Sequence, residues 1–437
     1  MNQHDISGLN ESSKRRVVWI LCYVVVFMAT WNAVLRPSVS IPVTPYYVLM
    51  PFIAVLLAAR TRWARRWFLW MIVFICYGFA VGVTYGTPLL MQAAQALKYA
   101  QLVTFFALLF WLYRTDTKAP VRLHGMVRTL TILVFSIAGI QLGTGLEFPT
   151  VVNEDSNIWL NTFFFTPNDL ALFLGGVMCI VICSDAAIWK KGLFLVAFFG
   201  LNLRNDAKAV ILASLLMIAM YCLVKVCIRL RIKPLVGLLI LVLVVSLAVL
   251  ALGDVKIKIG ESEFDFMELF QDPLVRIFNL EPYNLGGSIF DRTDALIHAI
   301  SALKSQSWIG LGPAGSVYTL SLPNFELLTA KSLHNAVAEV LAEFGPATLL
   351  VGFFLLKPLW KALLSIRPTQ QQIAQMCLVA AAPLLSVSQS AGYISNYAFW
   401  LTVFLIWCKP ARWRYTSIVS VTNDPQARSA TTSAQQA

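Results

Sequence analysis

Residues 234–252 read PLVGLLILVLVVSLAVLAL, a stretch without a single charged side chain. A run of about 18 or more apolar residues is long enough to cross the hydrocarbon layer of a membrane as a helix. Inside lipid the backbone has no water to bond, so a crossing segment must be a helix or part of a closed barrel. The run is continuous rather than alternating, which argues against a barrel strand. The stretch therefore predicts a transmembrane helix.

The rest of the chain has the same character. Of its 437 residues, 58% are hydrophobic and 13% are charged, whereas a soluble domain carries about 25% charged residues. The apolar runs predict an all-α fold, a polytopic transmembrane helical bundle of about 12 spans with a large, partly helical outer loop. The expected spans are residues 17–35, 44–59, 67–84, 93–113, 127–145, 169–186, 191–203, 207–228, 234–253, 335–356, 373–390 and 393–408.

Positive charge sets the expected orientation. Lys and Arg gather in the cytoplasmic loops of membrane proteins. With both chain ends in the cytoplasm, most of the 34 Lys and Arg residues fall on that side. This alternation requires the seventh span, 191–203, which is too short to cross alone. The net charge of +12 is then explained by topology and by anionic lipid, and not by nucleic-acid binding.

The spans divide the chain into five expected parts. A loop of 254–334 is far longer than a connection needs. Within it, TDALIHAISALKS at 293–305 has the apolar spacing of an amphipathic helix, and WIGLGPAG at 308–315 is a Gly/Pro break. The expected parts are a cytoplasmic N-terminus at 1–16, nine helices at 17–253, the large outer loop at 254–334, three helices at 335–408 and a disordered cytoplasmic tail at 409–437.

The N-terminal segment and the cysteines lead to two further expectations. The charged start, ending at Arg16, precedes an apolar run without a small-residue cleavage site, so we expect the first span to be retained. The eight cysteines all lie in or beside apolar runs, which suggests neither a disulfide framework nor a cysteine metal site.

Three cations near the outer ends of the expected spans are candidate ligand groups. Ionisable residues at such depths are costly unless they are paired or functional. Arg204 and Lys208 lie where the seventh and eighth spans meet, and the simpler alternative is a turn in which Asp206 pairs with one of them. Lys98 lies in the fourth span, where it could also be a lysine that extends to the interface.

A second group lies in and after the large loop. Arg292 opens the amphipathic helix, and an ordinary ion pair with a neighbouring Asp is the alternative. His334 and Asn335 stand at the outer mouth of the tenth span, where a lone His could equally be a capping or interfacial residue. Glu339 and Glu343 follow at one-turn spacing, so a polar stripe is expected to face a cavity or the interior of the bundle.

Two stretches together resemble a known family. DRTDALIHAISALKSQSWIGLGPAGSVY at 291–318, followed by SLHNAVAEVLAEFGPATLL at 332–350, is similar to the signature of the bacterial O-antigen ligase and polysaccharide polymerase superfamily. That pattern has an Arg, a helix, a G-x-G break, and then His-Asn opening a membrane helix. A Trp that often follows the family Arg is Leu296 here, and a common Pro before the break is Ser307. Neither departure changes a charged group. The departures therefore bear on which branch of the superfamily the chain resembles, more than on the resemblance to the superfamily.

Two further segments extend the resemblance. FFFTPNDLALFLGG at 163–176 is similar to the family's Asn-containing entry to a middle span, which places Asn168 in that role. The family usually has Ser-Arg-Gly or Ser-Lys-Thr at the start of a later span, where this chain has NDAKAVILA. Lys208 is therefore the better match there, and Arg204 is an accessory candidate.

The resemblance implies a metal-independent, inverting glycosyltransferase of the periplasmic face of the bacterial inner membrane. It would move a glycan from undecaprenyl diphosphate to a hydroxyl acceptor, with no cofactor. Arg292 and His334 would be catalytic, the first on phosphate oxygens and the second as general base. The residues expected to bind substrate are Lys208, Arg204, Asn335, Asn168 and Lys98.

Several functions remain open from the sequence. The acceptor could be a lipid A core sugar, as in an O-antigen ligase, or a growing chain, as in an O-antigen or exopolysaccharide polymerase. The ligase is slightly preferred because the long loop carries both the Arg and the His elements. A lipid-linked glycan flippase is the rival class, although transporters often have two similar halves, which are not seen here. A scaffold that only binds partners is a further alternative.

Overall fold

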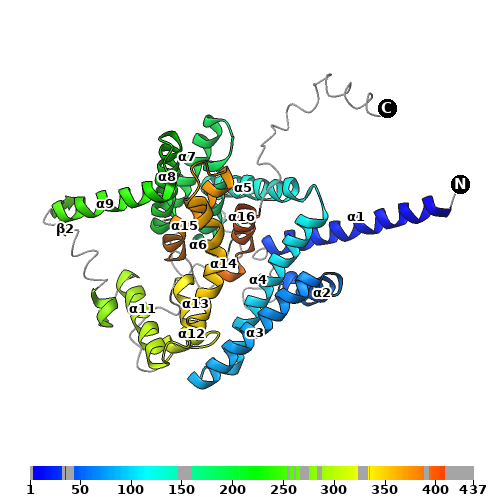
Figure 1. The fold of residues 1–437 in the computed structure, drawn as a ribbon, viewed down its shortest axis with the longest axis horizontal. Helices are drawn as coiled ribbons and strands as arrows, with labels where there is room; N and C mark the ends of the chain where they lie inside the picture. Colours follow the sequence, from blue (N-terminus) through cyan, green and yellow to red (C-terminus); the bar gives the residue numbers. More distant parts are fainter. Residues whose placement is uncertain are drawn as a thin grey trace.

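The computed structural model is a mainly helical assembly in which the chain folds back and forth many times (Figure 1). It describes residues 3–31, 35, 44–145, 160, 162, 164, 166–205, 207–252, 256–259, 262–265, 275–282, 288–322, 333, 335–387 and 393–408. The expected cytoplasmic tail at 409–437 and most of the loop at 146–166 lie outside these residues.

The helices and strands follow one another in a simple order. The helices are α1 (Gln3–Thr30), α2 (Pro45–Arg60), α3 (Arg62–Tyr85), α4 (Leu89–Thr115), α5 (Ala119–Thr144), α6 (Pro167–Cys183), α7 (Ile188–Arg204), α8 (Lys208–Arg229), α9 (Pro234–Leu252), α11 (Ser288–Ser305), α12 (Gly315–Leu320), α13 (Ala336–Phe344), α14 (Ala347–Leu363), α15 (Gln370–Val387) and α16 (Tyr397–Trp407). The strands are β1 (Lys256–Ile259) and β2 (Ser262–Asp265), and η2 (Tyr393–Ser395) is a 3-10 turn.

Each expected span overlaps a helix. Among the described helices, four are long and apolar enough to cross a membrane by length and composition: α3, α4, α5 and α8. Shorter apolar helices account for five more. The weakest expectation, the seventh span, is a helix of 17 residues, α7. The chain is therefore consistent with a helical membrane protein, while the count of about 12 crossings stays a prediction.

The helical fold is confirmed, and the large loop adds one short hairpin that the sequence did not predict. β1 and β2 form a two-stranded antiparallel hairpin, in which Lys256 pairs with Asp265 and Lys258 pairs with Glu263. The sequence KIKI alternates charged and apolar residues, and this period of two is that of a strand. The hairpin is short and leaves the helical character of the bundle unchanged.

The expected tenth span, 335–356, is two helices rather than one. α13 ends at Phe344 and α14 begins at Ala347. Between them Gly345 has a φ of +55°, a region that disfavours any residue with a Cβ. A Cβ on Gly345 would also collide with the backbone carbonyl oxygens of Trp308 and Ile309. The break therefore exists because another part of the chain packs directly against it.

α6 is the centre of the bundle. Nearly all of its side chains are buried, and it packs against α8, α15 and α16 (Figure 1). Gly175 permits this close packing, because a Cβ there would lie 3.1 Å from Leu385 Cδ2 on α15 and 3.7 Å from Val210 Cγ1 on α8. A larger residue would push both helices outward.

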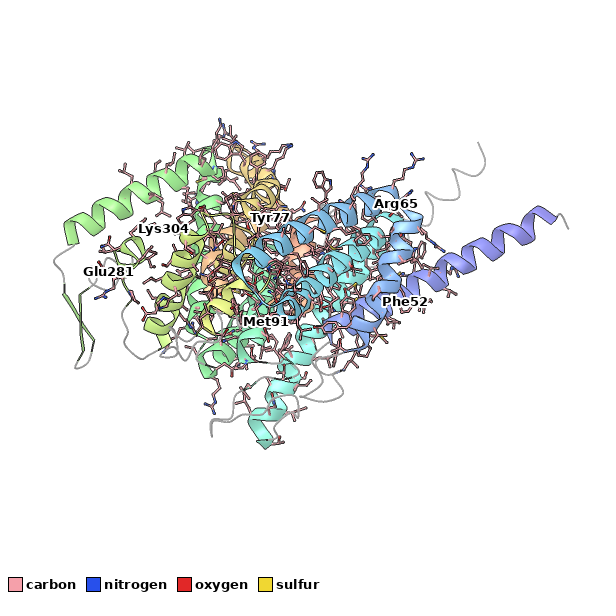
Figure 2. The ribbon with its side chains drawn as sticks, turned by 90° about the horizontal axis from the view of Figure 1, so that it is seen from below. Phe52, Arg65, Tyr77, Met91, Glu281 and Lys304 are labelled. Carbon is pink, nitrogen blue, oxygen red and sulfur yellow. The ribbon has the colours of Figure 1, made fainter. Side chains whose placement is uncertain are left out.

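The outside of the bundle is apolar where the expected spans lie. Large hydrophobic side chains such as Phe52, Trp70 and Val196 are well exposed, and Phe52 points away from the helices in Figure 2. A soluble monomer rarely exposes this much contiguous apolar surface. Contact with lipid explains it, in agreement with the sequence-based expectation.

Candidate active site

Two polar stripes meet inside the bundle. On α13, Glu339 and Glu343 are only 2% and 0% exposed, which confirms the prediction that this stripe faces the interior. On α4, Gln95 Nε2 donates to Glu339 Oε1 at 3.3 Å, and the Tyr99 hydroxyl donates to Glu343 Oε2 at 2.7 Å. The two stripes therefore hold α4 and α13 together through hydrogen bonds to both carboxylates.

Lys98 lies on α4 between the two residues that make these bonds. It is half-buried, and its charge acts on both Glu339 and Glu343. A buried carboxylate is costly unless an opposite charge or hydrogen bonds compensate it. Lys98 therefore balances the acidic stripe, a role that the sequence did not distinguish from a lysine reaching for the interface.

The Gly/Pro break after α11 packs against the end of α13. The Leu311 and Gly312 amides donate to the carbonyl oxygens of Ala342 and Glu343, both at 2.9 Å. The Ala314 amide donates to the Glu343 carboxylate, Oε1, at 2.8 Å. Glu343 thus accepts hydrogen bonds from two other segments, one at each carboxylate oxygen.

The start of α13 lies one turn from this cluster. Asn335 is the N-cap of α13, and its Oδ1 accepts from the Ala338 amide at 3.1 Å. An Asn at this position satisfies an amide that has no partner within the helix. His334, the predicted general base, lies outside the described residues. His334 directly precedes this capping residue in the chain, and Asn335 marks where the chain enters the helix.

Arg204 and Lys208 lie at the two sides of the turn between α7 and α8. Arg204 is the last residue of α7, Lys208 is the first of α8, and both are exposed. The turn itself is well anchored, because Asn205 exchanges two hydrogen bonds of 3.0 Å with the backbone of Leu160. Asp206, the alternative partner for either cation, lies outside the described residues.

Arg292 lies near the start of α11 and is half-buried. Two residues further along, Asp294 is buried and its charge acts on His298. Burial lowers the pKa of His298, and the nearby Asp294 carboxylate opposes that shift. Its half-buried position beside the Asp294 charge favours a structural role for His298.

Asn168 is the second residue of α6 and is half-buried. The helix start is fixed on both sides: the Thr166 hydroxyl accepts from the Asp169 amide at 3.1 Å, and the Asn396 side chain donates to the Asp169 carbonyl at 2.9 Å. Asn168 therefore stands on a well-held helix start next to α16.

The helices that carry the predicted residues form one connected group. α15 packs against α6, α8 and α13, whose starts carry Asn168, Lys208 and Asn335. α11, with Arg292, also packs against α13, and α4, with Lys98, is hydrogen-bonded to α13. The structure thus connects the helices that carry these residues.

The polar face of α4 was not predicted from the sequence. Gln92, Gln95 and Tyr99 recur at intervals of three and four residues, so they share one helix face. Gln92 is fully buried, and its Nε2 donates to the Thr87 carbonyl at 2.7 Å. Amide side chains at helical spacing inside an apolar run are the signal that could have found this face.

Acidic and thiol groups do not gather for metal binding in the part of the chain that the structure describes. No three His, Cys, Asp or Glu side chains there could hold a metal ion. A metal-independent mechanism remains a prediction.

The fold and these polar clusters define a class first: a helical membrane protein with enclosed carboxylates on α13 and charged or amide side chains at the starts of α6, α8 and α13. Comparison with known families narrows the class. Residues 192–354 match the family model described as O-Antigen ligase. This match confirms the resemblance seen in the motifs: residues 192–354 are similar to the O-antigen ligase family. No curated protein matches the chain.

Proposed function

We propose that the protein is a glycosyltransferase that moves a glycan from undecaprenyl diphosphate to a hydroxyl acceptor on the periplasmic side of the bacterial inner membrane. The family match at 192–354 carries this proposal. The matched region includes both predicted catalytic residues, Arg292 and His334, together with Arg204, Lys208 and Asn335. Both chain ends are then cytoplasmic, as the charge distribution predicts.

The cations stabilise the leaving group in this proposal. As the bond between the anomeric carbon and the phosphate oxygen breaks, negative charge develops on the diphosphate. Arg can bind phosphate oxygens with two parallel hydrogen bonds, and Lys adds a point charge. The exposure of Arg204 and Lys208 supports a role toward a ligand, because neither side chain is enclosed by the protein. Arg292 supplies the third cation.

His334 takes the proton from the attacking hydroxyl. A histidine is close to neutral at physiological pH and can accept a proton at that moment. The hydroxyl oxygen bonds to the anomeric carbon as the diphosphate leaves, so a single displacement inverts the configuration there. Asn335 positions the segment that carries His334, and this role is supported by its cap on α13.

The order of the helices also favours an anionic ligand on one side. If every expected span crosses the membrane, α4, α6, α8 and α13 all begin at the outer face. The N-terminal end of a helix carries a partial positive charge and unpaired amides. Asn168, Lys208 and Asn335 belong to these helix starts, whereas Lys98 lies further along α4. A diphosphate on that side would lie near the positive ends of these helix dipoles and near cationic side chains.

The acceptor is the finer part of the proposal. We favour lipid A core, which makes the protein an O-antigen ligase, and a growing O-antigen or exopolysaccharide chain is the alternative. A lipid-linked glycan flippase is the alternative from another class. A flippase would not need a general base at His334, so the two classes differ in what loss of this residue does.

A reconstituted reaction tests these alternatives. The purified protein is mixed with a synthetic undecaprenyl-diphosphate glycan in EDTA, with either lipid A core or the same glycan as acceptor. Product on lipid A core that is lost in His334→Ala supports a metal-independent ligase, and a lengthened glycan supports a polymerase. Transfer that stops in EDTA would refute metal independence. No transfer to either acceptor by folded protein would overturn the enzyme proposal and favour the flippase.

A further inference from the structure

The segment that follows α11 runs along the side of α3. The Tyr77 hydroxyl donates to the Ile309 carbonyl at 2.6 Å, and Tyr85 shares a hydrogen bond of 2.7 Å with Thr319. Between these two points, a Cβ on Gly312 would collide with the backbone of Gly78 and Gly82, so the segment and α3 are in direct backbone contact. Residues 309–319 therefore follow α3 from its middle to its end.

α3 fixes the depth of this contact. It is one of the four helices long and apolar enough to cross a membrane, and it carries no charge from Trp67 to its end at Tyr85. With a rise of 1.5 Å per residue, Tyr77 lies about 12 Å from Tyr85 and about 16 Å from Arg66. The hydrocarbon layer is about 30 Å thick. Tyr77, labelled in Figure 2, is thus near the middle of this layer, whichever end of α3 faces outward.

α4 and α13 give the same depth independently. Tyr99 follows the start of α4 at Leu89 by about 15 Å of helix, and its ring lies 5.3 Å from that of Phe344 at the end of α13. Phe344 also stacks on Phe74 of α3, with ring centroids 4.3 Å apart. The Gly/Pro break is bonded to this end of α13, so it lies well below the starts of both helices.

Non-helical backbone inside a membrane must have its polar groups satisfied by the protein. This segment meets that requirement closely. Within it, the amides of residues 306, 307, 308, 309, 311, 312, 314 and 315 all donate hydrogen bonds, and Pro313 has no amide hydrogen. Two carbonyls accept from side chains, Ile309 from Tyr77 and Leu311 from Thr87. Among the described hydrogen bonds, none comes from the Gly310 amide, so the pairing is extensive but leaves this one amide out.

In this arrangement Glu343 satisfies a backbone amide of the segment. Its Oε1 accepts the amide of Ala314, which would otherwise have to be satisfied at a depth without water. Gly310 and Gly312 have φ values of +128° and +78°, and a Cβ on Gly310 would lie 2.7 Å from the Glu343 carbonyl oxygen. The glycines let the turn approach α13 closely enough for these bonds to form.

The deepest part of the segment presents apolar side chains outward. Trp308 and Ile309 are 49% and 51% exposed, beside the apolar surface of α3. Exposed aromatic and aliphatic groups at this depth would meet lipid rather than water. Lys304, just before the turn (Figure 2), is exposed and long enough for its ammonium group to extend toward the interface.

We propose that residues 306–314 form a re-entrant turn within the membrane, and that Trp308 and Ile309 contact the acyl chains of bilayer lipids there. The segment then enters the hydrocarbon layer beside α3 and returns toward the surface through α12. The sequence placed all of 254–334 outside the membrane. This inference is independent of the proposed transfer reaction, because it concerns only the position of the chain relative to lipid.

Thiol labelling in native membranes tests the depth. Ile309→Cys is compared with Ser321→Cys, a matched exposed position just after α12, using a charged maleimide that reacts only in water. The unsubstituted protein gives the background, including the native exposed Cys76 beside Tyr77 on α3. We expect labelling of Ile309→Cys to be at least tenfold slower than that of Ser321→Cys, with both complete after dissolution in SDS. Equal rates in the membrane would overturn the proposal.

Photo-crosslinking tests the lipid contact without relying on thiol chemistry. A benzophenone amino acid replaces Ile309 or Ser321, and mass spectrometry identifies the adducts formed in native membranes. Lipid adducts at position 309, and none at position 321, support contact with acyl chains. If position 309 gives only adducts to the protein itself or to water, then the turn does not face lipid.

Discussion

The turn between α7 and α8 and the buried stripe on α13 both carry charge, but they use it differently. Arg204 and Lys208 are exposed on the turn. Glu339 and Glu343 are enclosed, and their oxygens accept hydrogen bonds from other parts of the chain. A charge that the protein encloses holds the fold, whereas one at the surface can reach a ligand. Residue type alone does not separate the two.

The largest expected effect belongs to His334. If it is the general base, His334→Ala should lower the rate of glycan transfer at least about 100-fold. His298→Ala is the matched control, because His298 is another histidine of the same region and we assign it a structural role. Rates are measured with purified protein at equal amounts of folded material. A transfer rate of His334→Ala within a few-fold of the parent would refute the assignment.

The next effect should be on stability, at the buried stripe. Glu343→Ala leaves the Tyr99 hydroxyl and the Ala314 amide without an acceptor, at a cost of about 1–3 kcal/mol for each. We expect a lower melting temperature in detergent and less protein in the membrane. Glu343→Gln, which retains an acceptor oxygen, should lose less. Glu281→Ala removes an exposed carboxylate and serves as the control (Figure 2); if it is as damaging, then burial does not explain the loss.

The exposed turn should show the opposite pattern. Lys208→Ala and Arg204→Ala should raise KM for the lipid-linked donor about tenfold, which corresponds to about 1.4 kcal/mol. The melting temperature should not change, because neither side chain is buried. Lys304→Ala, another exposed lysine, should have no effect on KM. A fall in melting temperature with an unchanged KM would show that the turn is structural.

Asn335 caps α13 and is also a predicted substrate-binding residue, and substitutions can separate these two roles. Asn335→Ala removes the cap of α13 and should cost about 1 kcal/mol of stability. Asn335→Asp keeps a capping oxygen and should restore the melting temperature. If Asn335 only positions the entry to the helix, then transfer by Asn335→Asp should return as well. Normal stability with transfer still abolished would instead indicate direct contact with substrate.

The smallest effect is expected from Tyr99→Phe. It removes one of the donors to Glu343 while keeping the ring that packs on Phe344. One hydrogen bond contributes about 0.5–1.5 kcal/mol, and more where its acceptor is charged. The melting temperature should fall less than in Glu343→Ala. A larger fall would mean that Tyr99 supports more than this single bond.

The sequence predicted much of the helical fold and less of the site. Apolar runs located the helices because a membrane segment must be both apolar and helical, and the spacing of Glu339 and Glu343 predicted their burial. The break at Gly345 was missed because it depends on residues 308–312, which are distant in the chain and approach it only after folding. The role of Lys98 was open for the same reason, since its partners are on α13.

The most direct test of this contrast is one measurement: the rate of glycan transfer per folded molecule, followed against donor concentration for the parent, Lys208→Ala and Glu343→Gln. We predict a raised KM for Lys208→Ala, and parent-like kinetics for those Glu343→Gln molecules that remain folded. If Lys208→Ala behaves as the parent while folded Glu343→Gln loses transfer, the account is contradicted. The buried stripe would then serve the reaction, and the exposed turn would not.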